Sequence, residues 1–183
     1  ILIESEVTSL MENPVIQALL TRRSVRRYLD KPLDSQVMEA VLKAGTYAPT
    51  GRGLQSPTIV AVENPEDRRA VQELNQKARG FDSDPYYGAP AILLVFTDSE
   101  RNTGVEDASC VLTAMMVAAH ALGAASCWIH GEKEMFELPE GKALLEKWGL
   151  PANLRGVGSL AIGYADGPAP QPKPRKEGYV IRI

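Results

Sequence analysis

Residues 91–97 read AILLVFT and residues 106–123 read EDASCVLTAMMVAAHALG, and these two stretches decide the fold. The first is a continuous apolar run of strand length, a pattern typical of a strand that is covered on both faces. The second has helical length, and Gly123 stands where a residue in the left-handed conformation would end the helix. A covered strand beside a long helix over Glu106–Leu122 predicts a layered fold with this helix buried at its centre.

The helix could instead be a membrane span, because Ala108–Ile129 carries no Asp, Glu, Lys or Arg and is long enough to cross a bilayer. The stretch is, however, rich in Ala, Ser and Thr, contains His120 and is broken by Gly123. It also lacks flanking basic residues, and Glu106 and Asp107 stand at its start. A helix buried inside a soluble protein is therefore favoured, and no membrane association is expected.

The remaining pattern predicts further helices and strands. Asn13-Pro14 and Asn64-Pro65 each combine an N-cap residue with proline at the first helical position, so helices are expected over 13–20 and 64–78. Further helices are expected over 34–46 and 139–148, and further strands over 58–63, 126–130 and 154–164. No repeat or linker divides residues 13–183, which predicts one α+β or α/β domain with a C-terminal arm over 165–183. Residues 1–12 are expected to be an N-terminal extension without a functional role.

Composition excludes several classes of protein. The chain has 183 residues, 44% of them hydrophobic, and a net charge of -3, which excludes disorder as the main state. The negative charge and the few aromatic residues also argue against nucleic-acid binding. Cys110 and Cys127 fit no metal or disulfide spacing, so both are expected to pack as small hydrophobic residues in a reducing cytoplasm.

The C-terminal tail is proline-rich, with prolines at 168, 170, 172 and 174 interspersed with Lys173 and Arg175. Such a segment is extended and cannot form its own helix. Ligands of SH3 domains place their prolines three residues apart, whereas here the spacing is two. We therefore expect an arm that lies along its own domain or along a partner subunit.

Residues 22–28 read RRSVRRY and form a local cluster of positive charge. In an extended chain the side chains of Arg22, Ser24 and Arg26 point to one side. Two guanidinium groups and a hydroxyl would then converge, an arrangement that suits a phosphate group. A solvated basic turn explains the same residues equally well, so both interpretations stay open at this point.

The segment Ala48-Pro49-Thr50-Gly51-Arg52-Gly53 predicts a loop whose glycines let backbone N–H groups approach a flat or anionic ligand. It is neither a Rossmann nor a Walker motif, and an ordinary turn is the alternative. Gln55 beyond it could offer an amide to a heterocycle. His120 is expected to be a satisfied core residue, while His130 could face a site. No hydrolase motif or metal-ligand spacing is present, so no metal site is predicted, and any chemistry is expected to belong to a bound cofactor.

Taken in order, these motifs resemble the short forms of the FMN-dependent nitroreductase family. The resemblance covers about residues 13–176 and depends on an ordered set of short motifs. They are Arg22-x-Ser24-x-Arg26, Ala48-Pro49-Thr50-Gly51 with Gln55-Ser56-Pro57, Tyr87-Gly88-Ala89-Pro90, Asp107-Ala108, Ala119-His120-Ala121-Leu122-Gly123, Ser126-Cys127-Trp128-Ile129, Ile162-Gly163-Tyr164 and Lys173-Pro174-Arg175.

The resemblance implies an α+β homodimer: a mixed β-sheet sandwiched by helices, two FMN molecules at the subunit interface, and exchanged C-terminal arms. The FMN site would comprise Arg22, Arg23, Ser24 and Arg26 with Lys173 or Arg175 at the phosphate, Pro49, Thr50, Gly51 and Gln55 along the flavin, and the backbone of Ala124, Ala125 and Ser126 near the isoalloxazine. Many members carry a flavin-binding Asn where this chain has Gly53. That contact is expected to be absent here, or to come from the backbone or Gln55.

The activity implied is ping-pong transfer of hydride from NAD(P)H through flavin N5 to nitro compounds, quinones or related acceptors, without a side-chain acid or base. Basic residues near Arg52 favour NADPH only weakly. One alternative is a relative with another flavin chemistry, namely dehydrogenation, dehalogenation or flavin fragmentation, with the loop Gly80–Gly88 as its lid. Another is a non-catalytic module that binds a phosphate ligand or a partner.

Overall fold

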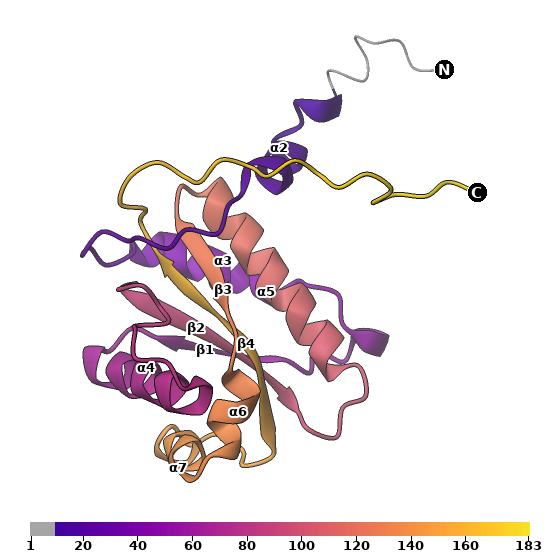
Figure 1. The fold of residues 1–183 in the computed structure, drawn as a ribbon. Helices are drawn as coiled ribbons and strands as arrows, with labels where there is room; N and C mark the ends of the chain where they lie inside the picture. Colours follow the sequence, from indigo (N-terminus) through magenta and orange to yellow (C-terminus); the bar gives the residue numbers. More distant parts are fainter. Residues whose placement is uncertain (1–9) are drawn as a thin grey trace.

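A four-stranded sheet forms the centre of the computed structural model, which describes residues 10–183 (Figure 1). The strands are β1 (Thr58–Val62), β2 (Ala91–Asp98), β3 (Ala125–Ile129) and β4 (Leu154–Gly163), in the spatial order β1-β2-β4-β3. The paired strands are antiparallel throughout, so the mixed sheet implied by the resemblance is wrong for these four strands. The physical reason is that a parallel partner comes only from the segment around Ser24, which makes an isolated bridge to Ser126 and is too short to form a strand.

Helices cover both faces of this sheet, as expected for an α+β domain. They are α2 (Pro14–Thr21), α3 (Ser35–Thr46), α4 (Pro65–Arg79), α5 (Gly104–Ala121), α6 (Glu132–Glu137) and α7 (Pro139–Lys147), with a short 3-10 turn η1 (Gly51–Gly53). The 3-10 turn lies where a loop is predicted, and α6 has no counterpart among the predicted elements. Part of the predicted N-terminal extension, residues 1–9, lies outside the described residues.

The core consists of two layers of side chains, one on each face of the sheet. Leu93 and Val95 of β2 pack with α3 and α5, whereas Leu94 and Phe96 pack with α4, α6 and α7. The stretch AILLVFT is buried along its whole length, which confirms a strand covered on both faces. Phe96 also meets Phe136 of α6 edge to face, with the ring centroids 4.7 Å apart.

Local sequence explains where several helices begin and end. The side chain of Asn13 accepts a hydrogen bond from Val15 N at 2.9 Å, and that of Asn64 accepts one from Glu66 N at 2.8 Å. Both caps precede a proline at the first helical position, as predicted. Gly123, at φ 78°, follows the last turn of α5, as its predicted role as terminator requires.

Within the described residues, helix α5 is buried along one face, and its burial as a central helix stays a prediction for the other face. Leu112 and Met115 reach the core, but Cys110 and Thr113 are exposed on the opposite face. Cys110 is exposed in this subunit rather than packed as a small hydrophobic residue, because no element within residues 10–183 covers it. Cys127 is buried as expected. His120 is half-buried rather than in the core, with its Nε2 2.8 Å from Thr21 Oγ1.

The C-terminal arm leaves the domain after β4. An ion pair between Arg27 and Asp166, with 3.0 Å between nitrogen and oxygen, fixes its start, and every residue from 166 to 183 is exposed. Figure 1 shows the arm, in yellow, leading from the end of β4 to a free C-terminus beyond α2. The arm is thus not buried against its own domain. Among residues 10–183, no helix is both long and apolar enough to cross a membrane.

Candidate functional site

The arginine-rich segment lies beside the first residues of β3. Ser24 and Ser126 form a parallel bridge, and Val25 N donates a hydrogen bond to Ser126 O at 3.1 Å. The segment is held from beneath by Tyr28, whose hydroxyl donates to Val25 O at 2.8 Å and to Ala161 O at 3.1 Å. The backbone of this turn is therefore fixed, and its side chains are presented at the edge of the sheet.

The guanidinium of Arg22 is the clearest sign of a ligand in this turn. Its Nη1 is buried and has no hydrogen-bond partner among the described residues. A buried N–H group of this kind needs an acceptor, and a charged oxygen such as that of a phosphate is the strongest one. The observation favours the phosphate interpretation over a solvated turn.

The other polar side chains of the turn differ in whether they already make hydrogen bonds within the chain. Arg23 donates through Nη1 to Leu20 O at 2.8 Å and to Arg22 O at 2.7 Å, so this nitrogen serves the end of α2. Arg26 is exposed. Burial raises the pKa of the Cys127 thiol, while Arg26, a hydrogen bond with Ser24 and Arg22 act in the opposite direction. Ser24 therefore lies at Cys127 of β3, with the charges of Arg22 and Arg26 in the surroundings.

A cavity of about 320 Å³ lies at the other end of the same strand, between the end of α4, the loop 80–88 and the end of β3. Aromatic rings form part of its wall, namely those of Phe81, Tyr87, Trp128 and His130, and Asp84 also lines it. The polar groups in it come from Arg79 and Asn75 among others, and Tyr87 adopts a left-handed backbone conformation at φ 57°. Flat walls with a few polar groups are typical of a cofactor or substrate pocket.

Sequence reasoning missed Asn75, which is the most constrained polar residue of this cavity. It is only 1% exposed, and its Nδ2 donates to His130 O at 2.9 Å, while its Oδ1 has no partner among the described residues. The available signal was an Asn on the buried face of a polar helix, beside Val71 and Leu74. A buried amide in such a place is unusual unless it has a partner.

The loop 48–55 forms a separate cluster at the start of α5. Gly51 N donates to the Asp107 carboxylate at 2.8 Å, and Gln55 N donates to Thr50 Oγ1 at 3.0 Å. Thr50 and Gln55 line a second cavity, of about 250 Å³. These contacts fix the loop at the start of α5, away from the arginine-rich turn and from the cavity beside His130.

The structure brings some of the predicted site residues together and leaves others apart. Arg22, Ser24 and the backbone of 124–126 are adjacent. The four steps along the chain from Ser126 to His130 span about 13 Å, at roughly 3.3 Å per step. The loop with Pro49, Thr50, Gly51 and Gln55 lies at the opposite end of α5, whose axis rises about 21 Å between Asp107 and Ala121. Lys173 and Arg175 lie in the exposed arm, where Arg175 Nη2 donates to Lys173 O at 2.6 Å.

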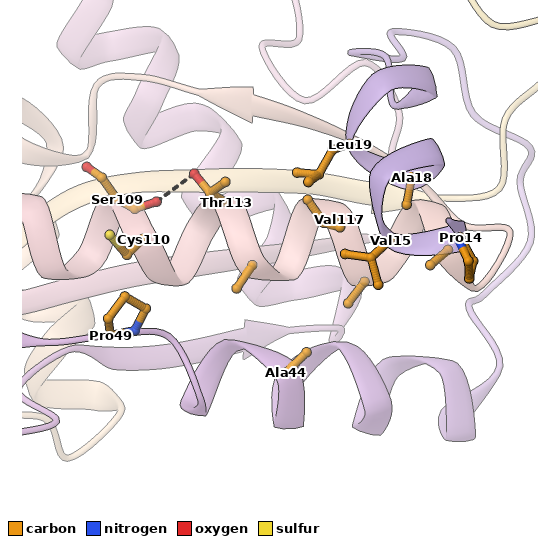
Figure 2. Close-up of a pocket in the computed structure, with 13 residues that line it drawn as sticks. Pro14, Val15, Ala18, Leu19, Ala44, Pro49, Ser109, Cys110, Thr113 and Val117 are labelled. Carbon is orange, nitrogen blue, oxygen red and sulfur yellow. Dashed lines mark hydrogen bonds between the residues drawn. The ribbon is translucent and has the colours of Figure 1, made fainter. Parts of the chain in front are cut away.

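An apolar groove of about 710 Å³ runs along the exposed face of α5 (Figure 2). Its lining from α2 includes Val15 and Leu19, which are 62% and 52% exposed. The α5 side consists of small residues, with Thr113 and Val117 among them, and Pro49 closes the end near Cys110. Exposed apolar surfaces of this extent are typical of interaction sites or ligand-binding grooves.

Comparison with known proteins gives a consistent result. The model of the nitroreductase family matches residues 19–81 and 72–164. A nitroreductase of Bacteroides fragilis solved with bound FMN superposes with a TM-score of 0.84 at 30% identity, covering 93% of this chain and 99% of that one. The FMN reductase (NAD(P)H) of Bacillus subtilis is 25% identical over 184 residues, 88% of this chain and 70% of that protein. The NADPH-flavin oxidoreductase of Vibrio harveyi is 24% identical over 186 residues, 92% of this chain and 72% of that protein.

Proposed function

The chain belongs to the nitroreductase family, and on that premise we propose that it is an FMN-dependent oxidoreductase that carries electrons from NAD(P)H to nitro compounds, quinones or related acceptors. The observation that carries this proposal is the buried, unpartnered Nη1 of Arg22 at the start of β3. The same strand ends in the aromatic cavity beside His130. FMN has the matching order of groups, because a flexible ribityl chain joins its phosphate to a flat ring.

The residues present fit FMN at both ends. Arg22, Ser24 and Arg26 would hold the phosphate through charge-assisted hydrogen bonds. The unpartnered Oδ1 of Asn75 can accept a hydrogen bond from the ring N–H, and Arg79 adds a positive charge to the same cavity. The ring is thus proposed beside 128–130, a few residues further along β3 than the backbone of 124–126 that the resemblance implies.

When bound, FMN would supply the redox chemistry, taking hydride from NAD(P)H at N5 and passing it to the acceptor in a ping-pong sequence. The chain would contribute binding, orientation and the exclusion of water. Phe81, Tyr87 and Trp128 provide flat surfaces against which a nicotinamide or an aromatic acceptor can lie. Arg79 would favour negative charge on the ring, as positive groups near a bound flavin do.

The active unit is proposed to be a homodimer, because the loop 48–55 cannot reach the Arg22 turn of its own chain. Two copies related by a two-fold axis, with their α5 helices packed antiparallel in the apolar groove, would bring the loop of one copy near the turn of the other. Each FMN would then contact both copies. The exposed arm would extend over the partner, where Lys173 or Arg175 can approach the phosphate.

The first experiment is a visible absorption spectrum of the purified protein, followed anaerobically on addition of NADH or NADPH. A flavin spectrum that bleaches, with colour restored by a quinone or a nitroaromatic compound, is expected. A bound flavin that neither nicotinamide reduces would point to one of the other flavin chemistries. A colourless protein that takes up no added FMN would contradict the proposal and leave a non-catalytic binding module.

A further inference from the structure

The loop 50–55 adopts a conformation that its own sequence does not favour. Arg52 and Gln55 have φ values of 58° and 50°, in the left-handed region that side chains other than glycine rarely adopt. Such residues cost free energy and persist only where surrounding contacts hold the backbone. Gln55 N donates to Thr50 Oγ1 within the loop, and the remaining contacts come from outside it.

Asp107, in the first turn of α5, contacts the loop and its flank from outside. Its carboxylate is 4% exposed and accepts hydrogen bonds from Gly51 N at 2.8 Å and from Ser56 Oγ at 3.2 Å. Thr103 Oγ1, just before the helix, donates a third at 3.1 Å. Burial raises the pKa of Asp107, but these hydrogen bonds outweigh it and hold the pKa below its usual range. The group is consequently a carboxylate at neutral pH.

Arg101 holds the same peptide from its other side. Its Nη2 donates to Gly51 O at 2.6 Å, and its Nε lies 3.9 Å from Asp107 Oδ2. Both backbone groups of Gly51 are therefore engaged by one charged pair. A Cβ atom at this position would lie 2.5 Å from Thr103 Oγ1 and 3.0 Å from Arg101 Nη2, so only glycine fits.

Stabilising α5 does not by itself explain this arrangement. A negative charge in the first turn is favourable for any helix, and the exposed Glu106 provides it as well. The Asp107 carboxylate is instead buried and accepts from the loop and its flank. Its contacts are those of a residue that orders a neighbouring segment.

We propose that Asp107, with Arg101, is a positioning residue that fixes Thr50 and Gln55 in the orientation in which the loop contacts FMN. The proposal rests on the proposed function, because it assumes that this loop lines the flavin. Asp107 would not touch the flavin itself, and in the homodimer it would act on the site of the partner copy.

The test compares Asp107→Asn with Glu106→Gln, which removes the same charge from the adjacent exposed position. For each variant, the affinity for FMN is measured by titration, the melting temperature is measured without FMN, and hydrogen exchange is followed over 48–56 in the apo protein. Asp107→Asn is expected to weaken FMN binding by at least about tenfold, the size of one charge-assisted contact. It should also speed exchange in the loop and weaken FMN binding by more than its fall in apo melting temperature accounts for. Glu106→Gln should stay close to wild type in all three measurements.

FMN affinity within about twofold of wild type in Asp107→Asn would overturn the proposal. So would a fall in affinity that merely follows a general loss of apo stability. If Asp107→Asn does not fold, Arg101→Gln decides the same question, because it alters the hydrogen bond to Gly51 O from a residue that lies before α5. Failure of wild-type protein to bind FMN would instead refute the proposed function, so the two failures are distinguishable.

Discussion

Ser24 pairs in parallel with Ser126, although the rest of the sheet in the described residues is antiparallel. The pairing places the arginine-rich turn at the start of β3, and the aromatic cavity lies at the end of that strand. The proposed phosphate site and the proposed ring site would thereby be connected by a single extended segment. The expected consequences concern the binding of FMN, the role of the second subunit and the stability of the fold.

Replacing both Arg22 and Arg26 with Ala should weaken FMN binding more than it weakens folding. Each lost charge-assisted contact is worth about 1.5–3 kcal/mol, so the combined effect is at least about a hundredfold in Kd. Arg22 is half-buried and Arg26 is exposed, so the apo melting temperature should change little. Arg69→Ala is the matched control, because Arg69 is an exposed arginine of α4 and belongs neither to the turn nor to the arm. Unchanged flavin content in the double variant would refute the phosphate assignment.

A mixture of two defective variants should recover flavin sites if each site draws on both subunits. One variant carries Arg22→Ala with Arg26→Ala, and the other carries Gly51→Val, whose side chain has no room beside Thr103. Random pairing makes half of the dimers mixed, and each mixed dimer has one intact site, so about a quarter of all sites should bind FMN after coexpression. No recovery above the two separate variants would mean that each site lies within one chain.

The sequence predicted the elements whose cause is local. The Asn-Pro starts of α2 and α4 depend on a cap and a proline that are neighbours in the chain, and β2 was recognisable from uninterrupted apolar residues. Helix α6 was missed because it has six residues and no capping side chain, and burial of Met135 and Phe136 against the sheet explains why it persists.

The candidate site was predictable as a set of motifs but not as an arrangement. The motifs place Gly51 and Arg22 in one site, whereas the fold places them at opposite ends of α5 within one chain. Helix α5 also carries apolar residues on both its buried and its exposed face, so the sequence does not distinguish the two faces. Whether Val117 meets its own chain or another copy depends on which elements pack on that helix, and this information is not local. Asn75 was missed for the same reason, because a polar residue in a polar helix gives no sign of burial until the sheet is placed.

A charge in the apolar groove should dissociate the homodimer. Val117→Glu puts a carboxylate on the face of α5 that the second copy would cover, where it would lack a partner. Analytical ultracentrifugation should show monomers, and FMN should be lost with the dimer. The control is Ala143→Glu, on the exposed side of α7. A Val117→Glu variant that remains dimeric would refute the groove as the interface.

Glu132 should make the folded protein less stable as pH rises, which is the opposite of the usual effect of a carboxyl group. The side chain is 1% exposed at the start of α6, where its Oε1 accepts hydrogen bonds from Ser159 Oγ and, at 3.4 Å, from Tyr86 Oη. Its Oε2 has no partner among the described residues. Burial raises the pKa of Glu132 from 4.5 to about 7, so the folded protein keeps a proton there that the unfolded chain has already released.

Between these two pKa values the folded state binds more protons than the unfolded state, so stability contributed by Glu132 falls as pH rises from about 4.5 to about 7. At 1.36 kcal/mol per pKa unit, the loss above that window amounts to about 3 kcal/mol. Glu132→Gln stays neutral at every pH and should therefore gain on wild type as pH increases. Urea unfolding of the apo protein at pH 5 and pH 8 measures this difference. Glu134→Gln, at an exposed position of the same helix, should show none of it. A constant difference between Glu132→Gln and wild type at the two pH values would mean that Glu132 is already ionised in the folded protein.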